Sequence, residues 1–551
     1  MNCDILIQNG KILDGTGSKA FSGAVAIKEG RIIAVGALPD GLNPAQTIDA
    51  KGNVVSPGFI DVHTHAGFMI ASPQHHTVME PFLRQGITTV VAGNCGVSPA
   101  PINHEYIDQL ATYWDAILPR DGLPWTWNTM GEFLEHVENV RPTFNIAQLV
   151  GHGTIRINVM GYNHNAATAD ELKAMRAQVR ESLEQGAAGL SFGLGYVPGV
   201  WAKTDELIEV ARDVARYNGR ITVHLRGQTI FIERAVNEMI RVAETVGAPL
   251  QISHYMVFSE DCTEQFYKSY KSTENARARG VEIGYDLLAY AVSSTTVFML
   301  YPPWMSEGGI SVFLERLKDE KIRDRLIHDL KTRGPEWPSW DTGMWTDSVY
   351  NPEVGWGTHR LFGFRKPEYQ KYEGLNLEAI AEDMGKDPFN ALFDLTLDEK
   401  GRLFYTAGFY DDDGMDMVMG LFHKLPHMAF MTDAVGIGHR ATHPSHYGSY
   451  PRFLGKHVRE WGTFTLEEAV RKSTSLPAAQ LGLDGRGILK EGAHADIVIF
   501  DPEKIIDKAF FAKPYQYSEG VESVIVNGVP VWHEGRYRAD RPAGQVIRRR
   551  G

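Results

Sequence analysis

The feature that most constrains the fold is a regular alternation of apolar runs and helical stretches through the middle of the chain. The apolar runs ITVH, LQISH and VEIGYDLL are separated by charged, amphipathic stretches of helix length. Such a rhythm predicts parallel strands joined by crossover helices. The number of units, spread over about 420 residues, favours a TIM-like (β/α)8 barrel with insertions. A doubly wound sheet is the alternative, but no GxGxxG follows the first strand to support it.

The two ends of the chain share a different pattern, in which short alternating strands are separated by turns that contain glycine. DILIQN, AVAIKEG and RIIAVG lie near the start, and ADIVIFDP, ESVIVNG and VPVWHEG near the end. We expect residues 1–57 and 485–551 to pair into one small β-sandwich domain, with the barrel at 58–484. The stretch from about 335 to 425, rich in Trp, Gly and Pro, breaks the barrel rhythm and is interpreted as an insertion able to cap the active site.

Composition excludes several classes of function. A net charge of −13 and a pI near 5.9 argue against nucleic acid as a partner, because phosphate binding needs a clustered positive surface. The basic run Arg548, Arg549, Arg550 is interpreted as a solvated tail. Three cysteines give no disulfide framework, and neither a secretory signal nor a membrane-length apolar run is present. We therefore expect a cytoplasmic protein with no membrane partner, and leave open whether it forms a homo-oligomer.

The strongest local signal is the sequence DVHTH, directly after the strand-like NVVSPGFI. His63 and His65 are two residues apart, so on a strand they point the same way and can offer two imidazoles to one metal. Cys95, in GNCG, directly follows the run TTVVAG, and thiolate is a good zinc ligand. The alternatives are two surface histidines and a small buried cysteine. The position at strand ends, where barrels of this type carry their active sites, favours the metal.

Three more polar residues repeat this position. His224 ends ITVH, His254 ends QISH, and Asp433 follows FMT near the end of the barrel. Each alone is an ordinary core or surface residue. Together with the earlier three, they form a set of six at several strand ends, whose ligand types suit zinc. Asp433 could hold the metal's water and move its proton.

On these motifs the chain resembles the amidohydrolase superfamily, and within it the N-acyl-D-amino-acid deacylase (D-aminoacylase) group. The motifs that carry the resemblance run through nearly the whole chain: SPGFIDVHTH, GNCGVSPAP, VGHGTIR, GLSFGLGYVPG, ITVHLRG, QISH, MTDAVGIG and GRGILKEGAHADIVIFDP. The cysteine of GNCG is the specific marker, since many relatives use a carboxylated lysine at that position.

The resemblance implies a tightly held zinc on Cys95, His224 and His254, and a weaker or optional second metal near His63 and His65 that can share Cys95. It implies that Asp433 is the general base and acid. It also implies that Tyr290, in YDLLAY, helps hold a small-molecule amide substrate.

Two departures from the family pattern concern the substrate. Met256 stands where relatives have a lysine, and Ser445 where they have an arginine, both of which help bind the free carboxylate of the substrate. Leu288 replaces a second tyrosine. We therefore hypothesise a substrate that lacks the α-carboxylate or presents it differently, because an unpaired carboxylate is costly to desolvate. The alternative is that Arg226, His439 or Arg440 supplies the missing charge.

Other residues carry weaker signals. His152 in VGHGT, and Ser191 and Tyr196 in GLSFGLGYVPG, are candidates for contact with the substrate, although backbone packing is an equal reading of His152. An aromatic lid and the core of the insertion are equal readings of four tryptophans: Trp337, Trp340, Trp345 and Trp356.

The sequence thus predicts a zinc-dependent hydrolase of an amide C–N bond in an N-acyl amino acid-like compound. The first alternative keeps the fold but opens a cyclic amide, as dihydroorotase-like and hydantoinase-like relatives do. The remote alternative is an inactive scaffold, which would be expected to have lost metal ligands, whereas all six are present.

Overall fold

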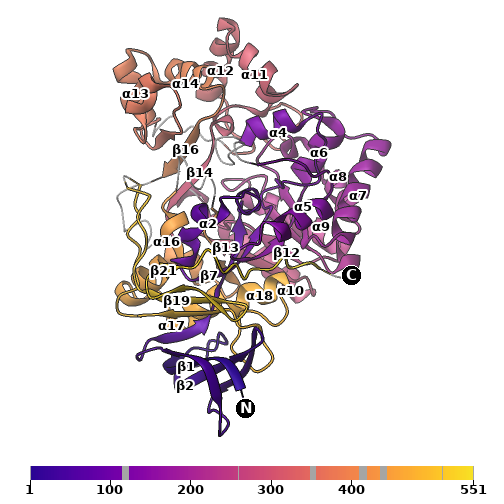
Figure 1. Cartoon of the computed structure of the whole chain (residues 1–551). Coiled ribbons are helices and arrows are strands. Elements are labelled where there is room, and N and C mark those ends of the chain that lie inside the picture. The colour runs from indigo at the N-terminus through magenta and orange to yellow at the C-terminus, as the bar shows by residue number, and fades with distance from the viewer. Residues whose placement is uncertain are drawn as a thin grey trace.

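The barrel predicted from the sequence forms the centre of the protein (Figure 1). The computed structural model describes residues 2–114, 123–257, 260–347, 355–408, 419–434, 443–511 and 513–549. In the described residues, parallel strands follow one another in chain order: β6 (Phe59–Thr64), β7 (Ile87–Ala92), β8 (Asn145–Gln148) continued by β9 (Val150–Gly151), β10 (Gly189–Gly193), β11 (Arg220–His224), β12 (Leu250–Ile252), β13 (Ile283–Leu287) and β17 (Met428–Phe430).

Two backbone hydrogen bonds join the last of these strands to the first. The N–H of Asp433 donates to the carbonyl of His63 at 3.1 Å, and that of His65 to the carbonyl of Ala434 at 3.0 Å. The parallel strands therefore form a ring, with β17 beside β6. This agrees with the predicted barrel, whose strands are buried on both faces because side chains fill the ring and helices cover it.

The helices that cover the barrel arise where the sequence has an amphipathic period. In α9 (Ile232–Val246), residues Ile232, Val236, Met239 and Ala243 share the buried face. Each large apolar side chain buried this way contributes about 1.5–3 kcal/mol. The other covering helices are α5 (Met130–Asn139), α6 (His152–Met160), α7 (Ala169–Glu184), α8 (Thr204–Ala211), α10 (Thr263–Ala278), α16 (Ser445–Arg452), α17 (Leu466–Ser473) and α18 (Ser475–Leu481). None of the described helices has the length and apolarity needed to cross a lipid bilayer.

Strands from both ends of the chain share one sheet below the barrel, where indigo and yellow strands lie side by side in Figure 1. Its order is β21-β20-β19-β18-β5-β1-β2-β3, with β4 paired to β1. The strands are β1 (Asn2–Ile12), β2 (Phe21–Lys28), β3 (Arg31–Gly36), β4 (Asn43–Asp49), β5 (Val54–Pro57), β18 (Ile497–Phe500), β19 (Val521–Val526), β20 (Val529–His533) and β21 (Arg536–Tyr537). β5 pairs with β18, so the two chain ends meet there.

A long excursion, residues 288–427, separates β13 from β17 and carries the orange helices at the top of Figure 1. The sequence pattern predicts an insertion at about 335–425, but the segment between β13 and β17 begins earlier. The reason is β14 (Val292–Thr296), which pairs with β16 (Phe404–Gly408) and so ties the start of the excursion to its end. β15 (His359–Phe362) completes this sheet. The helices between are α11 (Ile310–Arg316), α12 (Glu320–Thr332), α13 (Leu377–Met384) and α14 (Pro388–Asp398).

The interpretation of the basic C-terminus as a solvated tail was wrong. Arg548 donates to the Glu138 carboxylate at 3.0 Å and to the carbonyl of Gln185 at 3.1 Å. The guanidinium of Arg549 donates to the carbonyls of Asn218 and Leu481. Backbone carbonyls at loop ends, which composition does not reveal, fix these arginines against the barrel. Arg550 lies outside the described residues.

A buried ion pair joins the small sheet to the barrel. Asp496, just before β18, pairs with Arg486 and accepts hydrogen bonds from Asn145, at the start of β8, and from the backbone of Asn527. Both charged side chains are about 5% exposed or less. We expect Asp496→Ala to lower the free energy of unfolding by about 3 kcal/mol, because it leaves the buried Arg486 charge without the carboxylate that balances it. Urea unfolding measures this. Glu522→Ala, which removes an exposed carboxylate from β19, is the control and should change it by less than about 0.5 kcal/mol; equal losses would contradict the expectation.

Candidate metal centre

The six candidate ligands all lie at the carboxyl ends of barrel strands. His63 is the second-to-last residue of β6, and His65 directly follows that strand. His224 ends β11, and His254 comes two residues after β12. Cys95 and Asp433 each come three residues after their strands, β7 and β17. This edge of the ring is where barrels of this type carry catalytic groups.

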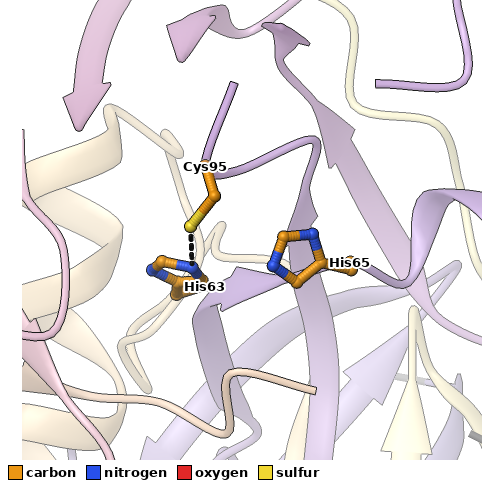
Figure 2. A group of neighbouring side chains, drawn as sticks. All are labelled: His63, His65 and Cys95. Atoms are coloured by element: carbon orange, nitrogen blue, oxygen red, sulfur yellow. Dashed lines mark hydrogen bonds between the residues drawn. The ribbon is translucent and has the colours of Figure 1, made fainter. Parts of the chain in front are cut away.

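The Cys95 thiol lies among three imidazoles. Its Sγ is 3.3 Å from His63 Nε2, 3.9 Å from His224 Nδ1 and 3.8 Å from His254 Nε2. His224 Nδ1 and His254 Nε2 are 2.9 Å apart. Figure 2 shows Cys95, which follows β7, pointing toward His63 and His65 at the end of β6. The structure thus brings together groups that are 32 to 159 residues apart in the chain.

Asp433 lies on the His63 and His65 side of the cluster. Its Oδ1 is 3.3 Å from His63 Nε2 and 3.7 Å from His65 Nε2. The carboxylate is 22% exposed, whereas both histidines are buried. Asp433 is therefore a member of the cluster that a molecule entering from outside can reach.

The electrostatics of the cluster favour ionised ligands. Burial alone would raise the pKa of Cys95, but His63, His224 and His254 outweigh it and hold that pKa well below the ordinary value. Burial would likewise raise the pKa of Asp433, and the neighbouring histidines hold it low. A thiolate and a carboxylate are the forms that bind a cation.

Several of these residues have a backbone conformation that side chains rarely adopt. The φ angles of Cys95, His254 and Asp433 are 51°, 35° and 51°. A left-handed conformation costs a non-glycine residue about 1–3 kcal/mol and is kept only where the surroundings fix it. For Cys95, the hydroxyl of Ser191 does so, since it donates to the carbonyl of Gly93 at 2.5 Å and accepts from the N–H of Gly96 at 3.1 Å. Ser191, a predicted substrate contact, is thus engaged with the loop that carries Cys95.

Glycines let this loop approach the neighbouring strand closely. A Cβ atom at Gly193, the last residue of β10, would lie 2.0 Å from the carbonyl oxygen of Cys95. A Cβ at Gly195 would lie 2.7 Å from His224 Nε2. Side chains at either position are therefore incompatible with the observed arrangement.

Two buried aspartates complete the site and were missed in the sequence. Asp286, in β13, lies 3.3 Å from His63 Nδ1 and accepts from the backbone N–H of His254 at 2.8 Å. Asp61 accepts from the hydroxyl of Thr432 at 2.6 Å, which ties β6 to the end of β17, and its pKa is raised to about 7 by burial. An acidic residue inside an apolar strand was the available signal, because a buried charge must have partners.

Tyr196 and His152 have different surroundings: Tyr196 contacts a candidate ligand, and His152 contacts Glu206. The Tyr196 ring packs 4.6 Å from that of His224, and its hydroxyl accepts from Thr295 at 3.3 Å. His152 is fully buried and lies 3.0 Å from Glu206, which also accepts from Arg156 at 3.0 Å. Tyr196 is therefore beside the cluster, while His152, the first residue of α6, belongs to a buried polar group with Glu206 and Arg156.

The residues at the positions where the sequence departs from the family pattern are buried. Met256 and Leu288 are 6% and 7% exposed. Ser445 begins α16, and its hydroxyl is 2.7 Å from His443 Nδ1. Tyr290 donates to Asp507 at 3.0 Å, so part of the small domain reaches this tyrosine.

Arg226 is fully committed to internal partners. It bonds Glu238 at 3.0 and 3.2 Å and donates to the carbonyls of Val200 and Ala202. Trp337 and Trp340 lie over its guanidinium at 5.5 and 4.9 Å. Trp356 packs on His359 and Phe389 inside the excursion, and Trp345 is buried. The four tryptophans therefore form no single lid. His439 and Arg440 lie outside the described residues.

The donor set fits a divalent metal ion. Three groups have ligand atoms within 4.8 Å of one another: His63, His65 and Cys95; Cys95, His224 and His254; and His63, His254 and Asp433. Mixed imidazole, thiolate and carboxylate ligands are typical of zinc. In the part of the chain described, the buried Nδ1 of His65 has no hydrogen-bond partner, so that ring is left with donor or acceptor capacity to use. Whether these side chains are the ligands stays a prediction.

Comparison with known proteins agrees with this arrangement. A family model described as "Amidohydrolase family" matches residues 46–326 and 419–532. The N-acyl-D-glutamate deacylase of Alcaligenes xylosoxydans xylosoxydans is 32% identical over 550 residues, covering 99% of this chain and 96% of its own.

Two solved structures have the same fold over the whole chain. The N-acyl-D-glutamate deacylase of Bordetella bronchiseptica, complexed with zinc and a phosphonate that mimics the tetrahedral intermediate, has a TM-score of 0.80 at 30% identity, and each chain is covered completely. A D-aminoacylase studied for its binuclear metal centre has a TM-score of 0.79 at 30% identity, covering 99% of this chain and 100% of its own. The predicted fold class and resemblance are confirmed.

The close approach at Gly193 yields a test of the site. In Gly193→Ala, the added Cβ would meet the backbone of Cys95, which cannot move aside without displacing the thiol. We expect the free energy of unfolding to fall by about 1–3 kcal/mol and bound divalent metal to be lost. Gly334→Ala is the matched control, because its Cβ would meet open space. Urea unfolding and metal analysis of the purified proteins measure both effects. Full metal content in Gly193→Ala would show that the approach does not position Cys95.

Proposed function

Because the chain belongs to the amidohydrolase family, we propose that it is a zinc-dependent enzyme that hydrolyses the amide C–N bond of an N-acyl amino acid-like compound. The observation that carries this proposal is the convergence of Cys95, His224 and His254, with ligand atoms within 4.8 Å of one another. The names of the similar proteins, N-acyl-D-glutamate deacylase and D-aminoacylase, support the substrate class.

In this proposal Cys95, His224 and His254 hold the tighter zinc. His63 and His65, which share Cys95, form a second and weaker site. Zinc bound at such a site supplies a Lewis acid, which polarises the scissile carbonyl and lowers the pKa of water towards about 7.

The chain's own acid–base group is Asp433. It is the partly exposed carboxylate of the cluster, and its histidine neighbours hold its pKa low, so it is ionised, which is the form from which a general base starts. As the water oxygen attacks the acyl carbon, Asp433 takes the proton from that water. It then delivers the proton to the leaving nitrogen as the C–N bond breaks. Its Oδ1 is directed at His63 and His65, so the carboxylate stays fixed through both steps.

The substrate in this proposal lacks a free α-carboxylate or presents it differently from the substrates of the relatives. Met256 and Ser445 offer no positive charge at the two positions where the family has cations. Both side chains are buried, and the Ser445 hydroxyl already faces His443. A carboxylate placed against them would lose its hydration without gaining an ion pair.

Two buried arginines each form an ion pair with a carboxylate inside the protein. Arg226 pairs with Glu238 at 3.0 Å, and Arg452 pairs with Asp507 at 3.0 Å. Arg452 also lies over the Tyr290 ring, 4.7 Å from its centroid. Among the described residues, these committed charges support a less acidic substrate. Tyr196, whose ring packs on His224, is the tyrosine we assign to contact with the substrate's acyl end.

Replacing the proposed base tests the mechanism. We expect Asp433→Asn to lower kcat about 10²–10⁴-fold while zinc content is retained, because the amide cannot take up the proton. Hydrolysis of N-acyl amino acids, their amides and cyclic amides, followed with metal analysis, measures this. Asp205→Asn, which alters a carboxylate that is 90% exposed, is the control. Unchanged turnover in Asp433→Asn would remove Asp433 from this role, and turnover of cyclic amides alone would favour the ring-opening alternative.

The preference for substrates without a carboxylate has its own test. We expect the wild type to hydrolyse an N-acetyl-D-amino acid amide with a higher kcat/KM than the free acid. Met256→Lys should reverse part of this difference by about tenfold, because one new ion pair of about 1.4 kcal/mol corresponds to that factor. Met256→Gln controls for loss of the thioether. A strong preference of the wild type for the free acid would contradict the proposed substrate and leave the proposed hydrolase activity unaffected.

A further inference from the structure

The excursion holds one loop of the barrel mouth through a cluster of hydrogen bonds. This loop, residues 225–231, follows β11 and therefore follows His224. The Asp347 carboxylate accepts from the backbone N–H of Gln228 at 2.6 Å, from that of Thr229 at 3.1 Å and from the Thr229 hydroxyl at 2.5 Å. The neighbouring Thr346 hydroxyl donates to the carbonyl of Arg226. Four bonds, three of them to the loop backbone, thus fix the loop to the excursion.

The Gln228 side chain extends this contact to the candidate metal centre. Gln228 is 3% exposed, and its Nε2 donates to the carbonyl of His254 at 2.9 Å and lies 3.0 Å from His254 Nδ1. The other nitrogen of that ring, Nε2, faces Cys95 at 3.8 Å and His224 at 2.9 Å. Gln228 therefore contacts the edge of the imidazole that points away from the cluster.

His254 needs such a support. It lies beyond the end of β12, with φ at 35°. The backbone N–H groups of its neighbours Ser253 and Tyr255 bond to Val223 and Asp286, but these bonds do not set the orientation of its ring. Asp286 accepts from its backbone N–H at 2.8 Å, and Gln228 holds its carbonyl and its ring. Rotation of the ring would break the contact with Gln228 and turn Nε2 away from Cys95.

We propose that Gln228 and Asp347 are positioning residues for the metal centre: Asp347 fixes the loop, and Gln228 fixes His254 with Nε2 directed at Cys95 and His224. The inference rests on the proposed zinc-dependent function. An amide suits the position because its nitrogen donates and its oxygen accepts, so it can serve either state of the ring nitrogen. Partners of this kind typically change metal affinity about 10–100-fold when they are removed.

Zinc affinity of the full-length protein, measured by competition with a chromogenic chelator, tests Gln228. We expect Gln228→Leu to weaken zinc binding about 10–100-fold, because leucine keeps the volume but offers the ring no partner. Gln228→Glu retains an oxygen that can accept from the ring N–H but loses the donor to the His254 carbonyl, so it should weaken zinc binding less than Gln228→Leu does. The visible absorption of the Co²⁺-loaded protein should change more in Gln228→Leu than in Gln228→Glu.

Asp347→Asn tests whether Asp347 positions the loop that carries Gln228. Its amide NH₂ group would face the N–H of Gln228, donor against donor, so we expect zinc binding to weaken about tenfold. Asp387→Asn is the matched control, because Asp387 also accepts from backbone N–H groups in the excursion, at 3.1 and 3.2 Å, but there it caps α14. We expect that control to bind zinc as the wild type does.

Opposite outcomes separate the two proposals. Wild-type zinc affinity and an unchanged Co²⁺ spectrum in Gln228→Leu would overturn the positioning role and leave the metal-dependent function intact. Equal losses in Gln228→Leu and Gln228→Glu would also overturn it, because the bond to the ring would not then be the cause. A wild-type protein that binds no zinc would overturn the proposed function together with this inference.

Discussion

The hydrogen bonds that join β17 to β6 are the constraint on which the candidate site depends. The N–H of Asp433 bonds the carbonyl of His63, and Asp61 bonds Thr432 through both backbone and side chain. These contacts connect segments 371 residues apart in sequence. Because strand ends in a closed ring face one another across its mouth, the same bonds that close the ring bring Asp433 to His63 and His65. The closure of the ring is therefore enough to bring the Asp433 carboxylate to His63 and His65.

Much of this could be predicted from the sequence, because the determining information is local. Alternating apolar runs and amphipathic helices gave the barrel strands, and polar residues directly after those runs gave the candidate ligands from His63 to Asp433. The buried partners were not found in this way. Asp286 lies inside a strand, and Gln228 lies in a loop; each contacts a residue about 25 to 220 positions away, which no local pattern reports. Ser191 was noticed, but as a substrate contact, whereas its hydroxyl holds the backbone on both sides of Cys95.

The start of the excursion and the position of the C-terminal arginines were harder to predict from the sequence, for a related reason. The excursion begins at residue 288 because β14 pairs with β16, and that pairing joins residues more than a hundred positions apart. Composition marked only its tryptophan-rich middle. At the C-terminus, three consecutive arginines suggested solvent, yet Arg548 and Arg549 find backbone carbonyls at the ends of barrel elements. Charge predicts exposure only where no acceptors are within reach, and acceptors at loop ends are set by the fold.

The charges around the cluster form a system that a cation would complete. Cys95, Asp433 and Asp286 surround His63, and although burial lowers the pKa of this histidine, those three negative groups raise it well above its usual value. The raised pKa values of His63 and His65 favour protonated imidazoles beside the buried thiolate and carboxylates. A divalent ion on the proposed ligands would take over that role, and its binding would release protons from His63 and His65. Desolvating several acidic groups is costly unless they share a cation or a proton, so the arrangement is easier to understand as a metal site than as a structural ion pair. The outer partners, Asp286 and Gln228, then serve the same end, because they keep each ring turned so that the nitrogen facing the cluster is available.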